Sequence, residues 1–258
     1  MSAEQPLLVE THHAVTTLTL NRPDKFNALS EALLDALHTT LTSLRDDSSV
    51  AVVIIAASGK AFCAGHDLKQ MRQNHGTEYY GDLFATCSRV MQLITELPQP
   101  VIASVNGMAT AAGCQLVATC DLAVAANTAQ FGVSGINLGL FCSTPSVALS
   151  RNVSRKRAFE LLMTGDFISA DQAVEYGLIN QSVEPDQLTQ QTVALAEKIA
   201  AKPAAARTVG KKLFYDQINL SLPDAYTMAS DVMACNMMSP ETVENVDAFL
   251  EKRPVRKT

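Results

Sequence analysis

The sequence lacks any long run of apolar residues. No stretch of about 18 consecutive apolar residues occurs in its 258 residues, so we expect no transmembrane helix. The first residues, MSAEQPLLVETHH, contain no arginine and no long apolar stretch, which is unlike a secretory or mitochondrial leader. We therefore expect a cytoplasmic location.

Cysteine is scarce and scattered. No two cysteines form a Cys-x-x-Cys pair, and no His/Cys grouping has the spacing of a zinc site. We therefore predict reduced thiols within the core and no bound metal. The cysteines are Cys63, Cys87, Cys114, Cys120, Cys142 and Cys235.

Positive charge is also in short supply. The formal net charge is −6 at pH 7, and no basic run is interleaved with aromatic residues, so binding to nucleic acid is not expected. A Gly-x-Gly-x-x-Gly turn after the first strand is missing too, which argues against a nucleotide-dependent oxidoreductase. An anionic ligand would need lysines and arginines placed locally.

The chain does contain alternating strand and helix patterns, followed by helices alone. Its length suits one large α/β unit with a helical appendage. Residues 14–20 predict a strand, and leucines at helical spacing after Ser30 predict a helix that this serine caps. The apolar run SVAVVIIAAS, residues 49–58, predicts a strand covered on both faces. From about residue 186 we expect only helices.

Two local patterns qualify this outline. Residues 72–80 are polar and predict a loop. The last helix is expected to begin at Ser239 and Pro240, as an N-cap followed by a proline, and to bury one apolar face. That face consists of Val243, Val246, Phe249 and Leu250.

A run of small residues lies between a predicted strand and a predicted helix, in SVNGMATAAGCQLVATCDLAVAA, residues 104–126. From Ala109 to Gly113 no side chain is larger than threonine, so a ligand can approach the backbone closely. Ala112 is expected at the N-terminus of the helix, where free N–H groups and the helix dipole favour an anion. The alternative is a tight packing turn that binds nothing.

Three segments resemble the signature blocks of a known family. They are LNRPDKFNALS (20–30), GKAFCAGHDLKQM (59–71) and VNGMATAAGCQLVATCDLAVAA (105–126), and FGVSGINLGL and AFLEKRPV follow at matching places. The chain is thus similar to the crotonase, or enoyl-CoA hydratase/isomerase, superfamily over essentially its whole length. The motifs FCAGHDLK and GLFCSTP resemble those of the enoyl-CoA hydratase domain-containing protein 3 subgroup.

The resemblance implies an α/β fold in which repeated ββα turns form a spiral core, residues 1–200. A C-terminal helical region, residues 201–258, would assemble trimers or hexamers. It also implies a coenzyme A thioester as substrate or ligand, with no permanently bound cofactor. The backbone N–H groups of His66 and Ala112 would hold the thioester carbonyl oxygen in an oxyanion hole. Loss of one such donor typically costs about 3–4 kcal/mol.

The same resemblance implies which residues meet coenzyme A. Backbone groups would cradle the adenine and pantetheine, while lysines would meet the phosphates. Each lysine taken alone is equally well explained as a solvated surface residue. The backbone positions are Lys25, Phe26, Ala64, Asp67 and Leu68, and the lysines are Lys25, Lys211 and Lys212.

The chain departs from the family where the chemistry is done. In hydratases of this family two glutamates activate water and deliver a proton, and the matching positions here hold Gln115 and Gly135. An amide can orient a water molecule but cannot take a proton near neutral pH. Because each positioned acid or base contributes about 10²–10⁴-fold, we expect ordinary hydration to be lost or weak.

Two alternatives to hydration remain. Cys142 and Ser143 fall near the position where some family members carry an acidic catalytic residue. A thiolate there, helped by the His66 imidazole, would make the protein a thioester hydrolase. The other alternative is a non-catalytic binder of CoA esters. Asp67 and Asp121 are both expected to cap turns or helices.

Overall fold

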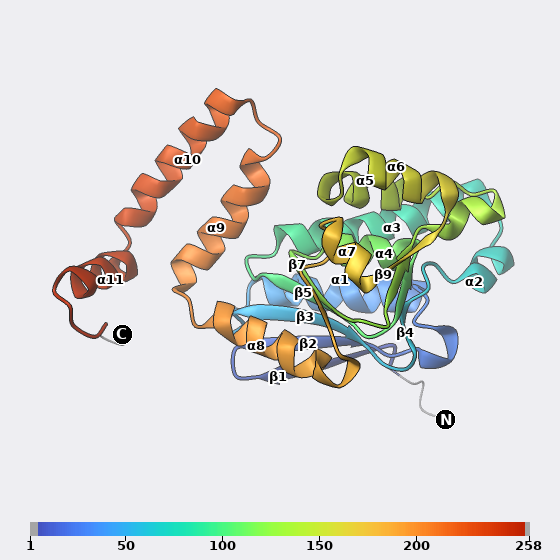
Figure 1. Ribbon diagram of the computed structural model, residues 1–258, viewed down its shortest axis with the longest axis horizontal. Helices are drawn as coiled ribbons and strands as arrows, with labels where there is room; N and C mark the ends of the chain where they lie inside the picture. Colours follow the sequence, from blue (N-terminus) through green and yellow to red (C-terminus); the bar gives the residue numbers. More distant parts are fainter. Residues whose placement is uncertain (1–4, 256–258) are drawn as a thin grey trace.

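The computed structural model describes residues 5–255, which form a layered α/β body with a helical extension at the C-terminal end (Figure 1). The larger of two sheets has six strands in the order β1-β2-β3-β5-β7-β10, and the smaller has four in the order β4-β6-β8-β9. The strands are β1 (Leu7–His12), β2 (Val15–Leu20), β3 (Val52–Ala57), β4 (Ala61–Cys63), β5 (Val101–Val105), β6 (Met108–Thr110), β7 (Leu122–Ala126), β8 (Gln130–Gly132), β9 (Phe167–Ser169) and β10 (Gln181–Val183).

Successive strands alternate between the two sheets. The pairs β3 and β4, β5 and β6, and β7 and β8 each place one strand in the large sheet and the next in the small sheet. Strands β2-β3-β5-β7-β10 and β4-β6-β8 run parallel, whereas β1–β2 and β8–β9 are antiparallel. The α/β fold of repeated ββα turns with a helical C-terminal region is therefore confirmed.

Helices cover the large sheet on both faces, as the apolar run at residues 49–58 predicts. In β3, Val53 and Ile55 belong to the core shared with α1 and α3, whereas Val52 and Ile54 belong to the cluster that α8 covers. The helices are α1 (Glu31–Arg45), α2 (Leu68–Gln73), α3 (Thr77–Glu96), α4 (Ala112–Thr119), α5 (Ser143–Asn152), α6 (Arg155–Thr164), α7 (Ala170–Glu175), α8 (Leu188–Ala200), α9 (Ala204–Gln217), α10 (Leu222–Met237) and α11 (Pro240–Leu250).

The first helix forms as its sequence predicts. The Ser30 hydroxyl accepts a hydrogen bond from the Leu33 N–H at 3.3 Å and so caps α1. The leucines at helical spacing form the face that packs toward α3. These buried residues are Leu33, Leu34, Leu37, Leu41 and Leu44.

The predicted loop at residues 72–80 is wrong. Helix α2 extends to Gln73 and α3 begins at Thr77, so only residues 74–76 separate them. The Tyr80 hydroxyl donates to the Met71 carbonyl oxygen at 3.1 Å, which holds the first turn of α3 against α2. The polar residues of this segment therefore mark exposed helix faces.

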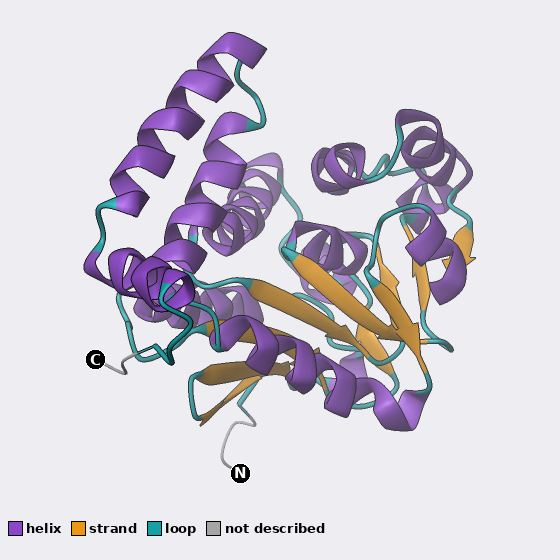
Figure 2. Ribbon diagram, turned by 60° about the vertical axis from the view of Figure 1, so that its left-hand side comes forward, coloured by secondary structure: helices purple, strands orange, loops and turns teal. Residues whose placement is uncertain are grey.

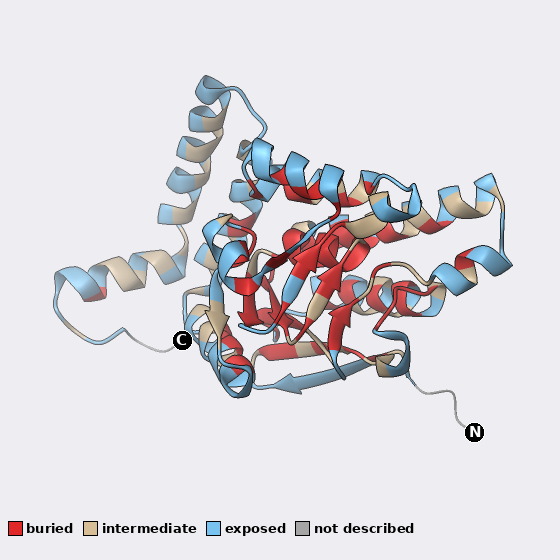
Figure 3. Ribbon diagram, turned by 45° about the vertical axis from the view of Figure 1, so that its right-hand side comes forward, coloured by how far each residue is buried: buried red, intermediate tan, exposed pale blue. Residues whose placement is uncertain are grey.

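Helices α10 and α11 stand away from the two sheets, whereas α9 joins them to the body (Figures 1 and 2). Helix α11 begins after Ser239 as expected, and the Ser239 hydroxyl accepts the Thr242 N–H at 3.2 Å. The expectation that α11 buries its apolar face is wrong for the single chain, because Phe249 is 81% and Leu250 is 70% exposed. Figure 3 shows the same exposure along most of α9–α11.

The division of the chain into residues 1–200 and 201–258 stays a prediction. No helix within residues 5–255 is both long and apolar enough to cross a bilayer.

Candidate active site

In the segment after β4, the main-chain amide of His66 is free of protein acceptors among the described residues. The Leu29 N–H donates to the Gly65 carbonyl oxygen at 2.8 Å, and the Asp67 N–H donates to the Leu29 carbonyl oxygen at 3.2 Å. Because successive groups of an extended chain point to opposite sides, the His66 N–H faces away from Leu29. Within residues 5–255 it donates to no protein acceptor.

The start of α4 presents a second free amide. The Ala111 N–H donates to the Gly132 carbonyl oxygen at 3.0 Å, and Ala112 is the first residue of the helix. Ala111 has a φ of 49°, a left-handed value that is unfavourable for a residue with a side chain. The Ala112 N–H has no protein acceptor in the described part of the chain, and it lies at the positive end of the helix dipole.

Two glycines bring these segments together. A Cβ added to Gly65 would lie 3.3 Å from the Ala112 nitrogen and 3.0 Å from the Ala111 Cβ. A Cβ added to Gly113 would lie 2.1 Å from the Cys63 carbonyl oxygen, so the start of α4 rests directly on β4. The structure therefore packs the chain at His66 against the chain at Ala112.

Several residues implied for coenzyme A lie around the neighbouring turn. The Ala64 N–H donates to the Phe26 carbonyl oxygen at 3.0 Å, while the Phe26 and Leu68 side chains are about half exposed. Lys25 and Asp67 line one surface hollow of about 660 Å³. The structure thus gathers all five backbone positions in one region.

Asp67 is a cap, as predicted. Its carboxylate accepts the Gln70 N–H at 3.2 Å and caps α2, and it pairs with the Arg22 guanidinium at 3.0 Å. Burial is the largest single influence and opposes ionisation of this carboxyl. The hydrogen bonds from Arg22 and from the Gln70 and Lys69 N–H groups, together with the charge of Arg22, outweigh it, so the pKa of Asp67 lies below its ordinary value.

Arg22 and Asn27 shape this turn, although the sequence analysis did not point to them. The buried Asn27 side chain accepts the Arg22 N–H at 2.8 Å and donates to the carbonyl oxygens of Ser58 and Ala61, both at 2.8 Å. Arg22 also donates to the Ala28 carbonyl oxygen at 2.6 Å. Their presence beside Pro23 in the block NRPDKFN was the available signal.

The two remaining lysines lie on α9, apart from this turn. The Lys211 ammonium donates to the carbonyl oxygens of Ile94 and Gln99 and to Asp121 Oδ2, which uses its three protons. In contrast to the expectation from the sequence, Lys211 has no donor left for a phosphate. Lys212 is exposed and pairs with Asp216 at 2.6 Å.

Asp121 is not a cap, which corrects the prediction. Its Oδ2 accepts the Val101 N–H at 2.6 Å, at the start of β5, besides the Lys211 ammonium. Its Oδ1 accepts the Tyr215 hydroxyl at 2.7 Å. No local pattern points to these partners, because Lys211 and Tyr215 lie about ninety residues further along the chain.

The two positions at which the family resemblance implies glutamates, Gln115 and Gly135, differ in how much room they offer. Gln115 is buried on α4, and its Oε1 atom has no hydrogen-bond partner within residues 5–255. A Cβ added to Gly135 would lie 2.6 Å from the Leu140 carbonyl oxygen and 2.8 Å from Cys142 Sγ. The atoms around Gly135 therefore leave no room for a glutamate side chain.

The thiol and hydroxyl considered for hydrolysis are not activated. Burial raises the pKa of the Cys142 thiol, and its Sγ lies 3.5 Å from the Val133 carbonyl oxygen. The Ser143 hydroxyl donates to the Phe141 carbonyl oxygen at 3.3 Å. In the described part of the chain, no hydrogen bond joins His66 to either group.

Both ring nitrogens of His66 are buried, and the ring is neutral at pH 7. Desolvation lowers its pKa from 6.5 to about 4, and neither ring nitrogen has a hydrogen-bond partner within residues 5–255. The ring packs edge-on against Phe84 of α3, with centroids 5.2 Å apart. A neutral ring can accept a proton or a hydrogen bond from a ligand, but it does not supply a positive charge at pH 7.

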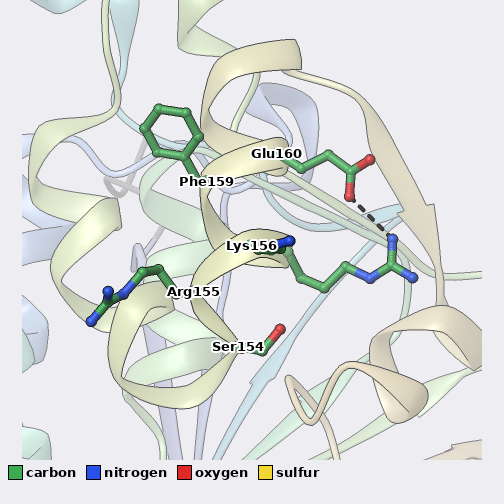
Figure 4. A pocket seen from close by; sticks show the side chains of 6 residues that line it. Ser154, Arg155, Lys156, Phe159 and Glu160 are labelled. Atoms are coloured by element: carbon green, nitrogen blue, oxygen red, sulfur yellow. Dashed lines mark hydrogen bonds and ion pairs between the residues drawn. The ribbon is translucent and has the colours of Figure 1, made fainter.

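A separate basic hollow of about 780 Å³ lies at the start of α6 (Figure 4). Arg155, Lys156 and Arg157 line it, and Arg157 is paired with Glu160 at 3.1 Å. This arrangement is that of a solvated helix end. Among residues 5–255 no group of three His, Cys, Asp or Glu side chains could hold a metal ion.

Residues 10–257 match the family described as enoyl-CoA hydratase/isomerase. The chain belongs to this family. Enoyl-CoA hydratase domain-containing protein 3 of Mus musculus is 42% identical over 98% of the chain and 85% of the mouse protein. Crotonyl-CoA hydratase of Syntrophomonas wolfei is 33% identical over 97% of both chains.

Solved structures of family members agree with this fold. An enoyl-CoA hydratase of Mycobacterium smegmatis is 59% identical and superposes with a TM-score of 0.96, covering 98% of this chain and 99% of its own. Human enoyl-CoA hydratase domain-containing protein 3 is 42% identical with a TM-score of 0.95, covering 98% and 100%. The expected resemblance to that subgroup of the enoyl-CoA hydratase/isomerase family is confirmed.

The expectation of a cytoplasmic location is contradicted. The relatives from mouse, rat, Xenopus, human and zebrafish are all named as mitochondrial proteins. The expectation rested only on the composition of the first residues, and composition there is a poor guide because a leader is not part of the folded domain.

Proposed function

We propose that this enoyl-CoA hydratase/isomerase family protein binds an acyl-CoA thioester and stabilises negative charge on the thioester oxygen through the main-chain amides of His66 and Ala112. The observation that carries the proposal is that both amides lack a protein acceptor and lie on segments packed together at Gly65. Preorganised N–H donors of this kind stabilise an enolate oxygen without reorganisation during the reaction.

The turn at residues 22–28 would hold the coenzyme A part of the ligand. Backbone groups of Lys25, Phe26, Ala64, Asp67 and Leu68 surround this turn, which Arg22 and Asn27 brace. Lys25, which lines the hollow at this turn, would supply positive charge to the phosphates, whereas Lys212 lies apart from the turn on α9. The protein would need no permanently bound cofactor and no metal for this step.

We further propose that ordinary hydration is lost or slow. Gln115 cannot act as a base, and the packing around Gly135 excludes a second carboxylate. A relative named crotonyl-CoA hydratase favours the opposite expectation, so turnover has to be measured. Thioester hydrolysis at Cys142 or Ser143 and non-catalytic binding are the alternatives, and the buried, protonated thiol favours the second.

Removing the Ala112 N–H tests the site directly. Proline is tolerated at the first position of a helix, so Ala112→Pro deletes this donor. Because Ala112 is buried and Ala111 before it has a left-handed φ, folding of the variant has to be checked alongside binding. We expect calorimetry to show acyl-CoA binding weakened about tenfold, the value of one hydrogen bond, with binding of free coenzyme A unchanged.

Ala204→Pro is the control for a proline at the first position of a helix, because Ala204 is exposed and is the first residue of α9. Circular dichroism would check that both variants fold. Equal acyl-CoA affinity in folded Ala112→Pro and the wild type would contradict the oxyanion hole, and so would the absence of acyl-CoA binding by the wild type.

A further inference from the structure

Helix α9 faces the core with polar side chains spaced four residues apart. Arg207, Lys211 and Tyr215 lie on one face of the helix, because residues four apart are neighbours on its surface. A helix that docks on a protein core normally presents an apolar stripe instead. We refer to these three residues as the α9 stripe.

Lys211 is the centre of the stripe. It is the one buried residue of α9, and its ammonium lies 2.8 Å from the Ile94 carbonyl oxygen, 2.9 Å from that of Gln99 and 2.7 Å from Asp121 Oδ2. Ile94 belongs to the last turn of α3, where carbonyl groups favour a cation. Every donor of this buried charge therefore has a partner in the core.

Asp121 connects the stripe to the large sheet. It directly precedes β7, and it accepts the Val101 N–H at the start of β5 in addition to Lys211. The Tyr215 hydroxyl, one turn further along α9, donates to its other oxygen at 2.7 Å. One carboxylate thus joins two strands to two positions of the extension.

Arg207 supplies the third attachment. Its guanidinium donates to the Ala51 carbonyl oxygen, just before β3, at 2.7 Å. From Arg207 to Tyr215 the attachments span about 12 Å of helix axis. Contacts spread over this length fix the direction of a helix as well as its position.

The rest of the extension has little other hold on the core. Helix α9 packs mainly along α10, and α10 has no buried residue within the part of the chain that the structure describes. We propose that the α9 stripe is a polar clasp that sets the direction of α9–α11. Breaking the clasp would release the extension as a unit and leave the two sheets folded.

Hydrogen exchange of the full chain tests this proposal. Lys211→Met removes the charge and leaves Asp121 and two carbonyl groups without their partner, a severe change for buried groups. We expect the amides of α9–α11 to exchange about a hundredfold faster, while those of β3 and β5 keep their protection. Tyr215→Phe removes one hydrogen bond and should give a smaller effect, about tenfold, in the same helices.

Lys212→Met is the control, because Lys212 is the next residue on α9 but its side chain is 77% exposed. It should leave exchange unchanged. Unchanged protection of α9–α11 in both test variants would overturn the proposal. Equal loss of protection in β3, β5 and α9–α11 in Tyr215→Phe would overturn it too, because the network would then be part of the core.

Discussion

Gly135 occupies a position where the backbone leaves no room for a side chain. Because a Cβ there would meet both the Leu140 carbonyl oxygen and Cys142 Sγ, we expect Gly135→Ala to lower the free energy of unfolding by about 1–3 kcal/mol. Chemical denaturation would measure the change.

Gly81 provides the comparison. It is exposed on α3 with no atom within 4 Å of an added Cβ, so Gly81→Ala should raise the free energy of unfolding by about 0.5–1 kcal/mol. If Gly135→Ala were as stable as the wild type, the loop from Leu140 to Cys142 would yield easily and a glutamate at position 135 would be feasible.

The buried His66 ring makes stability depend on pH. Its pKa is depressed from 6.5 in the unfolded chain to about 4 in the folded one, so the unfolded state binds more protons between these values. The contribution of His66 is complete above about pH 6.5 and is lost as the pH falls toward 4, with a slope of at most about 1.4 kcal/mol per pH unit.

Urea unfolding of the wild type and of His66→Gln between pH 4 and pH 7 would test this dependence. The variant keeps the main-chain amide, and its stability should fall less steeply with acid. Parallel curves for the two proteins would show that the ring gains its proton as readily in the folded state as in the unfolded state.

Among the elements, α9–α11 expose apolar side chains that a single chain does not cover. Met233 is 69%, Met238 79% and Phe249 81% exposed, on the region expected to assemble trimers or hexamers. We expect light scattering to give the mass of a trimer or hexamer for the wild type and a smaller mass for Met233→Glu with Phe249→Glu.

Lys156→Glu, on the exposed start of α6, changes surface charge without touching these helices and should keep the wild-type mass. A monomeric wild type would contradict the expected assembly. If the double variant kept the wild-type mass, subunits would have to meet through another surface.

The elements also show what a sequence can reveal. Helix α1 follows from Ser30 and its leucines because both signals are local. The apolar face of α11 was correctly predicted, but it was expected to be buried and is exposed in the single chain. Periodicity does not say whether the surface that covers such a face belongs to the same chain. Asp121 was misread as a cap because its partners are distant in sequence.

At the candidate site, too, local patterns reveal some features, whereas features that depend on tertiary contacts cannot be predicted from the sequence. The small-residue run and the family blocks point to His66 and Ala112 before any coordinates are seen. The contact between them at Gly65 is a tertiary feature, as is the closed space around Gly135, so neither could be derived from local patterns.

For the whole molecule, the proposed absence of two catalytic carboxylates predicts poor turnover of crotonyl-CoA. We expect the wild type to hydrate it slowly, since each absent acid or base removes about 10²–10⁴-fold. Gln115→Glu should raise the rate measured by loss of enoyl absorbance, because it restores one carboxylate on α4.

Gln115→Met is the matched control, because it has a similar size but no proton-accepting group, and it should stay slow. Rapid hydration by the wild type that Gln115→Met abolishes would show that an orienting amide is enough for this reaction. The proposed loss of ordinary hydration would then be wrong.

The proposed donors are main-chain groups, and one of them belongs to a residue that is already alanine. A systematic alanine scan would therefore pass over the centre of the site: it leaves the amide of residue 66 in place and has nothing to replace at residue 112. Searches for loss-of-function variants would instead converge on Gly65 and Gly113, whose lack of a side chain lets the chain near residue 66 and β4 pack against the start of α4.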